Sequence, residues 1–265
     1  MFADKEIDMI RELQHLYPYL SSKIYLSPKE TPQIEEILEK VCNIEKWSAW
    51  IDSSGKGDPP PDFYSDKYQL MMDVMRVDDH ERKNKKGTLH NPSYAHNRDL
   101  EHELRAKGIL GSFPDAQVFI NGVTDLPTFE DHNYSFYRKS FQRVIDKHIN
   151  NIPLYRANHP NYKIIFFIFD ESSAYFESEK KIDRTQSFHA GMRLSGRPHW
   201  FFFDEVFINA FVGKGIDYVF WYTPYKQYEF ANPQIDLPQL CVFDLAKPIE
   251  LRDKYDEEKM VSSEI

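Results

Sequence analysis

The chain has 265 residues, of which 41% are hydrophobic and 15% aromatic, so it can form one large domain with a core rich in aromatic rings. Its formal net charge of −9 argues against general electrostatic binding to nucleic acid or to an anionic membrane, without excluding a local basic groove. Only Cys42 and Cys241 are present, which excludes a disulfide framework and favours a reducing, cytoplasmic setting. The charged N-terminal residues and the shortness of every apolar run predict neither a signal peptide nor a membrane span.

The first third of the chain predicts two helices followed by three short strands. Apolar residues at helical spacing predict a helix over 7–16, and a threonine N-cap followed by proline opens a second helix over 32–46. Residues 46–52 have the composition of a strand. The runs 62–65 and 68–77 then predict two adjacent strands.

The rest of the chain alternates helices with strands. In chain order we expect a surface loop at 78–98, a helix at 99–107, a strand at 117–120, a helix from 133 to 149, strands at 163–169 and 200–203, a helix at 207–211, and strands at 217–222 and 240–245. This order predicts an α/β or α+β fold with a mixed central sheet flanked by helices. We expect one elaborated domain over 1–251 and a charged, flexible tail over 252–265.

One acidic residue is unusual within the strand expected at 68–77. Asp73 lies in a largely apolar stripe between Met71 and Met75. A buried carboxylate is costly unless a metal ion, a lysine or arginine, or a hydrogen-bond donor pairs with it. Asp73 is therefore a candidate functional residue, together with Asp62 just before the preceding strand. The alternative is that Asp62 is a turn residue and that Asp73 faces solvent on an edge strand.

The order of one helix, three strands, a helix and a strand, with these two acids, resembles the PD-(D/E)xK nuclease superfamily. The matching residues are Pro61-Asp62 for the first half of the motif and Asp73-Val74-Met75 for the second. The resemblance covers roughly residues 31–77 and, more loosely, 133–171. It implies a restriction-endonuclease-like core with insertions, acting on or binding nucleic acid.

The resemblance also implies Mg²⁺- or Mn²⁺-dependent hydrolysis of phosphodiesters, with Asp62 and Asp73 as metal ligands. The family's lysine falls at Met75. The protein is therefore either catalytically degenerate or takes the missing cation from another residue. Lys67 and Lys163, which belong to the neighbouring strand region, are the candidates for that cation.

A glutamate of the first helix sometimes adds a third acid in this family. Glu45 falls near the centre of the apolar face of the helix expected at 32–46, if that helix extends so far. Glu39 points away from that face and is the other candidate. The competing interpretation is that the helix ends before Glu45.

A second acidic group follows two of the expected strands. Asp170-Glu171 comes just after the strand 163–169, and Asp204-Glu205 comes after the run 200–203. Ligands of open α/β sheets bind beyond the carboxyl ends of strands, so these acids could share a divalent cation. The competing interpretation makes them N-caps of the helices that follow.

Two further hypotheses come from other classes of protein. Arg193 and Arg197 could bind an anion such as phosphate, and with Asp170 and Asp204 they would define a phosphoryl- or nucleotide-processing enzyme. The chain lacks the glycine motifs of Walker loops, dinucleotide sites and nucleophile elbows. A non-enzymatic interaction module is the other hypothesis, with the tyrosine-rich segment 222–230 as an interface for a protein partner.

Overall fold

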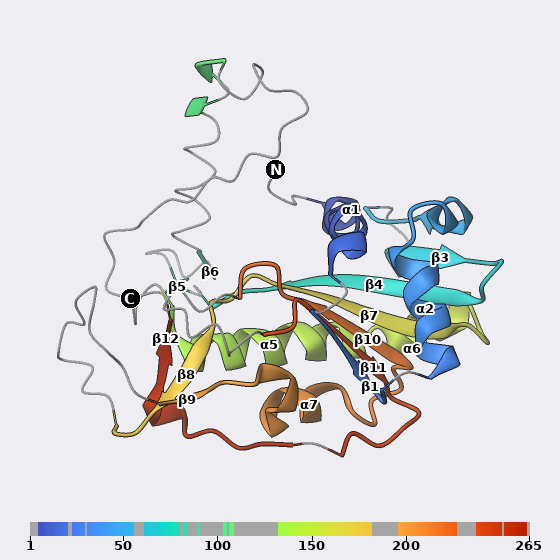
Figure 1. The fold of residues 1–265 in the computed structure, drawn as a ribbon. Helices are drawn as coiled ribbons and strands as arrows, with labels where there is room; N and C mark the ends of the chain where they lie inside the picture. The colour runs from blue at the N-terminus through green and yellow to red at the C-terminus, as the bar shows by residue number, and fades with distance from the viewer. Residues whose placement is uncertain are drawn as a thin grey trace.

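The computed structural model describes most of the chain. The described residues are 5–20, 23–29, 31–55, 61–79, 132–181, 196–226, 237–250 and 252–263, with a few short pieces between 82 and 108. Figure 1 shows a central sheet that lies between two sets of helices. The expected strand at 117–120 and most of the expected helix at 99–107 lie outside the described residues.

Seven strands of the described chain form the central sheet, in the spatial order β1-β11-β10-β7-β4-β3-β2. β4, β7 and β10 are parallel, whereas β2, β3 and β4 form an antiparallel meander and β10 pairs antiparallel with β11. The sheet is therefore mixed, which confirms the predicted α/β class. The bounds are β1 Ile24–Ser27, β2 Ile51–Asp52, β3 Phe63–Ser65, β4 Leu70–Val77, β7 Lys163–Asp170, β10 Tyr218–Tyr222 and β11 Leu240–Asp244.

Helices cover both faces of this sheet (Figure 1). One face carries α1 (Glu6–Leu16) and α2 (Pro32–Cys42), and the other carries α5 (Tyr134–Ile149), α6 (Ile152–Asn158) and α7 (Glu205–Phe211). Every residue of β7 after Lys163 is buried, as its continuously apolar sequence predicts for a strand covered on both sides. None of the described helices is long and apolar enough to cross a membrane.

The alternating side chains of β4 divide the core into two clusters. Met71 and Met75 pack with α5, α6 and α7, on what we call the α5 face. Met72 and Val74 pack with α1 and α2, on the α2 face. Because successive side chains of a strand point to opposite faces, Asp73 shares the α5 face with Met71 and Met75.

Two runs that were expected to be strands contain 3₁₀ turns instead. Lys46–Ala49 is the turn η2, which leaves only β2 as a strand, and Phe201–Phe203 is the turn η4. The turn η2 stacks Trp47 on Trp50, with ring centroids 5.1 Å apart, and lets the indole of Trp50 donate a 2.9 Å hydrogen bond to the carbonyl of Lys40. Buried aromatic packing thus overrides the strand propensity of this run. The remaining short elements are η1 (Tyr17–Tyr19), η5 (Glu257–Lys259), β5 (Arg82–Lys83) and β6 (Leu89–His90).

A smaller antiparallel sheet ties the C-terminal segment to the body. It consists of β12 (Met260–Ser262), β8 (Tyr175–Ser178) and β9 (Gly196–Pro198). The backbone N–H of Asp253 also donates a 2.7 Å hydrogen bond to the carbonyl of Phe203. The prediction of a flexible tail is therefore wrong for residues 252–263. The reason is that Met260 and Val261 are buried and anchor an otherwise charged segment.

Candidate functional site

Asp62, the residue just before β3, lies beside Asp73 of β4. β3 and β4 pair antiparallel with Phe63 opposite Met72, so the next pair along the ladder is Asp62 and Asp73. A carboxylate oxygen of Asp62 accepts a 2.8 Å hydrogen bond from the backbone N–H of Val74. Burial, and then the charge of Asp73 and a hydrogen bond between the two carboxyl groups, raise the pKa of Asp62 from 3.8 to about 8. We call these two residues the carboxylate pair.

Two helices of the α5 face close over Asp73. The hydroxyl of Tyr155, on α6, donates a 2.6 Å hydrogen bond to Oδ2 of Asp73. Nδ1 of His148, near the end of α5, contacts the same oxygen. Because Asp73 is the acceptor for Tyr155, we infer that Nδ1 of His148 carries the hydrogen of the second contact. The other ring nitrogen of His148 makes no hydrogen bond to a described residue.

Neither lysine candidate lies at the carboxylate pair. The ammonium group of Lys67 lies over the ring of Tyr68, 5.4 Å from its centroid, and Tyr68 packs on the α2 face. Lys163 donates a 3.0 Å hydrogen bond to the hydroxyl of Tyr218, which also belongs to the α2 face. Asp73 faces the other way, so the role assigned to Lys67 is wrong, and so is the alternative of Lys163. Met75 is a buried core residue.

Neither glutamate candidate joins the pair as a third acid. α2 ends at Cys42, before Glu45, whose side chain is exposed. Glu39 forms an ion pair with Lys46 at 3.0 Å and accepts a 3.2 Å hydrogen bond from Asn43. Because α2 packs on the face opposite the carboxylate of Asp73, the sheet itself separates both glutamates from the pair. The competing interpretation, that the helix ends before Glu45, is confirmed.

The alternative acidic residues are occupied by hydrogen bonds. One oxygen of Asp170 accepts hydrogen bonds from Tyr137 at 2.6 Å and Trp221 at 2.8 Å. Its other oxygen accepts from the backbone and side chain of Ser172. The ammonium of Lys226 lies 3.5 Å from the first oxygen, Oδ2. Glu171 forms a bidentate ion pair with Arg76, one contact of which measures 2.7 Å.

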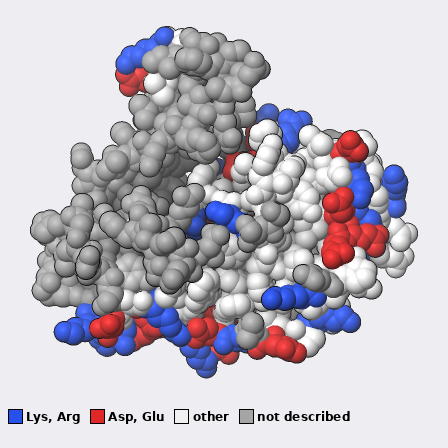
Figure 2. Space-filling view, in the orientation of Figure 1, with Lys and Arg blue, Asp and Glu red and all other residues white. Residues whose placement is uncertain are grey.

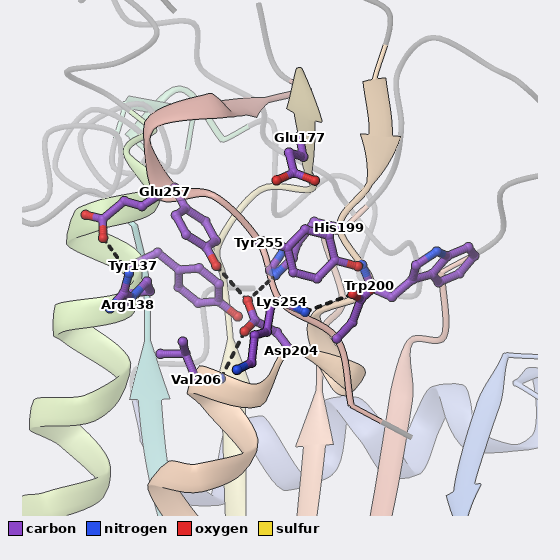
Figure 3. A network of polar contacts seen from close by, with 12 residues as sticks. Tyr137, Arg138, Glu177, His199, Trp200, Asp204, Val206, Lys254, Tyr255 and Glu257 are labelled. Carbon is purple, nitrogen blue, oxygen red and sulfur yellow. Dashed lines mark hydrogen bonds and ion pairs between the residues drawn. The ribbon is translucent and has the colours of Figure 1, made fainter. Parts of the chain in front are cut away.

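Asp204 has its own partners, which Figure 3 shows around its carboxylate. Tyr134 donates to Oδ2 at 2.6 Å, and Nε2 of His199 lies 2.8 Å from the same oxygen. Oδ1 accepts from the backbone N–H of Val206, which makes Asp204 the N-cap of α7. The N-cap interpretation is therefore confirmed for Asp204. Asp170 and Asp204 bind different tyrosines, one turn apart on α5, and form no common open site.

A third buried aspartate completes this arrangement. The hydroxyl of Tyr175 donates to Asp79, which also accepts from the side chain of Ser173 at 2.9 Å. The rings of Tyr134 and Tyr137 both contact that of Tyr175. We call the three pairs the aspartate–tyrosine network; its members are Asp79–Tyr175, Asp170–Tyr137 and Asp204–Tyr134. Fully satisfied buried networks of this kind hold a unique packing, so we assign it a structural role.

The anion-binding prediction concerned Arg193 and Arg197. Arg193 lies outside the described residues. The guanidinium of Arg197 binds Asp253 at 2.8 Å and Glu177 at 3.0 Å, and it stacks over the ring of Tyr255 at 4.2 Å. These contacts fasten the C-terminal segment to β8 and occupy Arg197 with neighbouring carboxylates.

We expect His199 to make the protein less stable in mild acid. Burial lowers the pKa of His199 below its ordinary 6.5, although Asp204 acts in the opposite direction. The unfolded chain therefore takes up this proton first, and stability is lost as the pH falls below about 6.5. The melting temperature of His199→Phe should depend less on pH between about 7 and 5 than that of the natural chain. The matched control is the exposed His15→Phe, which should leave the slope unchanged. An equal slope in all three proteins would contradict the assignment.

Comparison with known protein families, with curated proteins and with solved structures finds no match to this chain. The interpretation of the carboxylate pair therefore depends on its geometry alone.

Proposed function

We propose that this protein is a metal-dependent phosphodiesterase of the nuclease type, with the carboxylate pair at its centre. The single observation that carries the proposal is the position of Asp62 directly beside Asp73, where burial and mutual repulsion raise the pKa of Asp62 to about 8. Two such carboxylates are unfavourable together without a shared proton or a cation. When β5, β6 and α6 are set aside as insertions, the order α2, β2, β3, β4, α5, β7 matches the helix and strand order of the PD-(D/E)xK resemblance and supports the proposal.

The donor set suits magnesium or manganese. Mg²⁺ commonly takes one or two protein carboxylates and completes its shell with waters and substrate phosphates. Asp62 and Asp73 supply such a set. Among the described residues there is no group of three or more His, Cys, Asp and Glu side chains that could hold a metal, so a closed zinc site of protein ligands finds no support there. A bound ion of this kind polarises the phosphate and lowers the pKa of a bound water.

His148 is our candidate for the role of the lysine missing at Met75. Its Nδ1–H donates to Asp73, which fixes the ring orientation and leaves the Nε2 lone pair free in the neutral imidazole. An imidazole oriented by a carboxylate in this way can accept a proton from an attacking water. Its side chain is 15% exposed, so the ring lies at the boundary between the core and the surface.

The mixed charge of the protein surface indicates that a substrate would be recognised by local contacts. Figure 2 shows acidic and basic side chains interspersed over the described part of the face in view, and the whole sequence carries a net charge of −9. A protein of this kind has no general electrostatic attraction for a polyanion. Substrate recognition would therefore depend on groups next to the carboxylate pair.

The test is degradation of DNA and of RNA, followed while Mg²⁺ or Mn²⁺ is titrated. We expect cleavage that requires the cation, is abolished by Asp73→Asn, and falls about 100-fold or more in His148→Gln. The control is Asp146→Asn, an exposed aspartate on the same helix as His148, which should cleave like the natural chain. Cleavage that survives Asp73→Asn would exclude the assignment, and no cleavage under any condition would refute the proposed activity.

A further inference from the structure

Three half-exposed aromatic rings lie next to the carboxylate pair. The ring centroid of His159 is 4.4 Å from that of Tyr64 and 5.0 Å from that of Tyr162. The hydroxyl of Tyr162 donates a 2.7 Å hydrogen bond to Asp66, which anchors the outer ring. All three side chains are partly exposed. We call Tyr64, His159 and Tyr162 the aromatic shelf.

The shelf and the carboxylate pair are built on the same two elements. Asp62 and Tyr64 are two residues apart at β3, so they share the α5 face at a spacing of roughly 7 Å along the strand. Tyr155, which binds Asp73, and His159, which caps α6, are four residues apart, a spacing of roughly 6 Å along a helix. The strand spacing therefore places Tyr64 about one nucleotide length from Asp62, and α6, which carries Tyr155, brings His159 to the same shelf.

We propose that the aromatic shelf stacks an unpaired base of a single-stranded nucleic acid whose neighbouring phosphate lies at the carboxylate pair. This inference rests on the proposed function, and it specifies the substrate class. Single strands present the faces of their bases, and aromatic side chains that stack on them are a common means of binding without sequence preference. A duplex keeps those faces inside its own stack.

The test measures binding separately from cleavage. Asp62→Asn protein is titrated, in EDTA, into fluorescently labelled oligonucleotides, and their anisotropy reports binding. The oligonucleotides are a single strand of thymidine, a single strand of uridine and a blunt duplex. Asp62→Asn keeps an acceptor for the Val74 N–H and removes the repulsion between the carboxylates. We expect the single strand to bind more tightly than the duplex, with either sugar.

Variants of the shelf identify the contact. Adding Tyr64→Leu should weaken single-strand binding about five- to tenfold, whereas adding Tyr64→Phe should not change it, because the ring remains. Tyr19→Leu, at a tyrosine that is 79% exposed and outside the shelf, is the matched control. Melting temperatures measured for each variant identify any loss of fold.

The possible outcomes separate the two proposals. Equal binding of duplex and single strand, or a single-strand preference that Tyr64→Leu leaves unchanged, would overturn the stacking inference even if the natural chain cleaves nucleic acid. Shelf-dependent binding of single strands by a chain that never cleaves them would uphold the inference and refute the proposed catalysis.

Discussion

Asp62→Asn is expected to raise the melting temperature of the metal-free protein and, at the same time, to abolish cation-dependent cleavage. The pKa of Asp62 rises from 3.8 to about 8 on folding, so the folded chain holds a proton that the unfolded chain loses. The contribution of Asp62 to the free energy of unfolding is fully present below about pH 3.8, and it is lost as the pH rises toward 8. The amide of an asparagine at this position carries no charge, so folding does not require it to take up a proton. Replacing buried charged groups by neutral ones often stabilises a protein by about 1–4 kcal/mol, and each kcal/mol is roughly 2–4 °C in a chain of this size.

The gain in stability of Asp62→Asn should depend on pH, and this dependence identifies the raised pKa of Asp62 as its cause. In EDTA the difference between Asp62→Asn and the natural chain should be small at pH 5 and largest near pH 9. Asp146→Asn, at an exposed aspartate of α5, is the control and should show no such trend. A loss of stability in Asp62→Asn at pH 9 would mean that ionised Asp62 stabilises the fold. That result would contradict the repulsion between the two carboxylates.

Lys226→Met is expected to be among the most destabilising single substitutions in the chain. Lys226 is 4% exposed, with its ammonium 3.5 Å from Asp170 and 3.1 Å from the carbonyl of Ser173. Removing one member of a buried ion pair leaves the other charge uncompensated, at a cost of about 3–5 kcal/mol. Urea denaturation should therefore show a large fall in the midpoint with little change in slope.

Two further variants check this explanation. Lys254→Met removes an ion pair with Glu205 in which the lysine side chain is 84% exposed, and its effect should be close to zero. Lys226→Met combined with Asp170→Asn should lose less stability than the two single changes added together, because the double variant leaves no unpaired charge. Additive losses would show that Lys226 acts through packing and not through Asp170.

Much of the fold was predictable because its strongest signals are local. The continuously apolar run at β7 identified a central strand, and the N-cap Thr31 located the start of α2. The errors arose where distant contacts decide the local structure. The turn at Trp47 packs its ring against that of Phe63 in β3, with centroids 5.4 Å apart, and Met260 fastens the charged tail through β12. Neither contact is visible in a short window of sequence.

The candidate site was only half predictable, for a similar reason. The alternation of β4 singled out Asp73 as a carboxylate among apolar side chains, and Asp62 followed from its place before the preceding strand. His148 and Tyr155 were missed because they come from helices far away in the chain, and nothing local marks either as a partner of Asp73. The one available signal was the position of His148 on the helix expected at 133–149; no helix was expected at Tyr155, which lies on α6. The lysine and glutamate candidates failed because only the packed sheet decides which face each side chain occupies.

Calorimetric titration of Mn²⁺ into the metal-free protein tests most directly whether the carboxylate pair is a cation site. At pH 7 the pair holds one proton, since the pKa of Asp62 is about 8, and a cation must displace it. Binding measured in buffers of different ionisation enthalpy should therefore release close to one proton per ion at pH 7 and far less at pH 9. Binding should be lost in Asp62→Asn and in Asp73→Asn. No binding by the natural chain, or binding that survives both substitutions without proton release, would contradict the account.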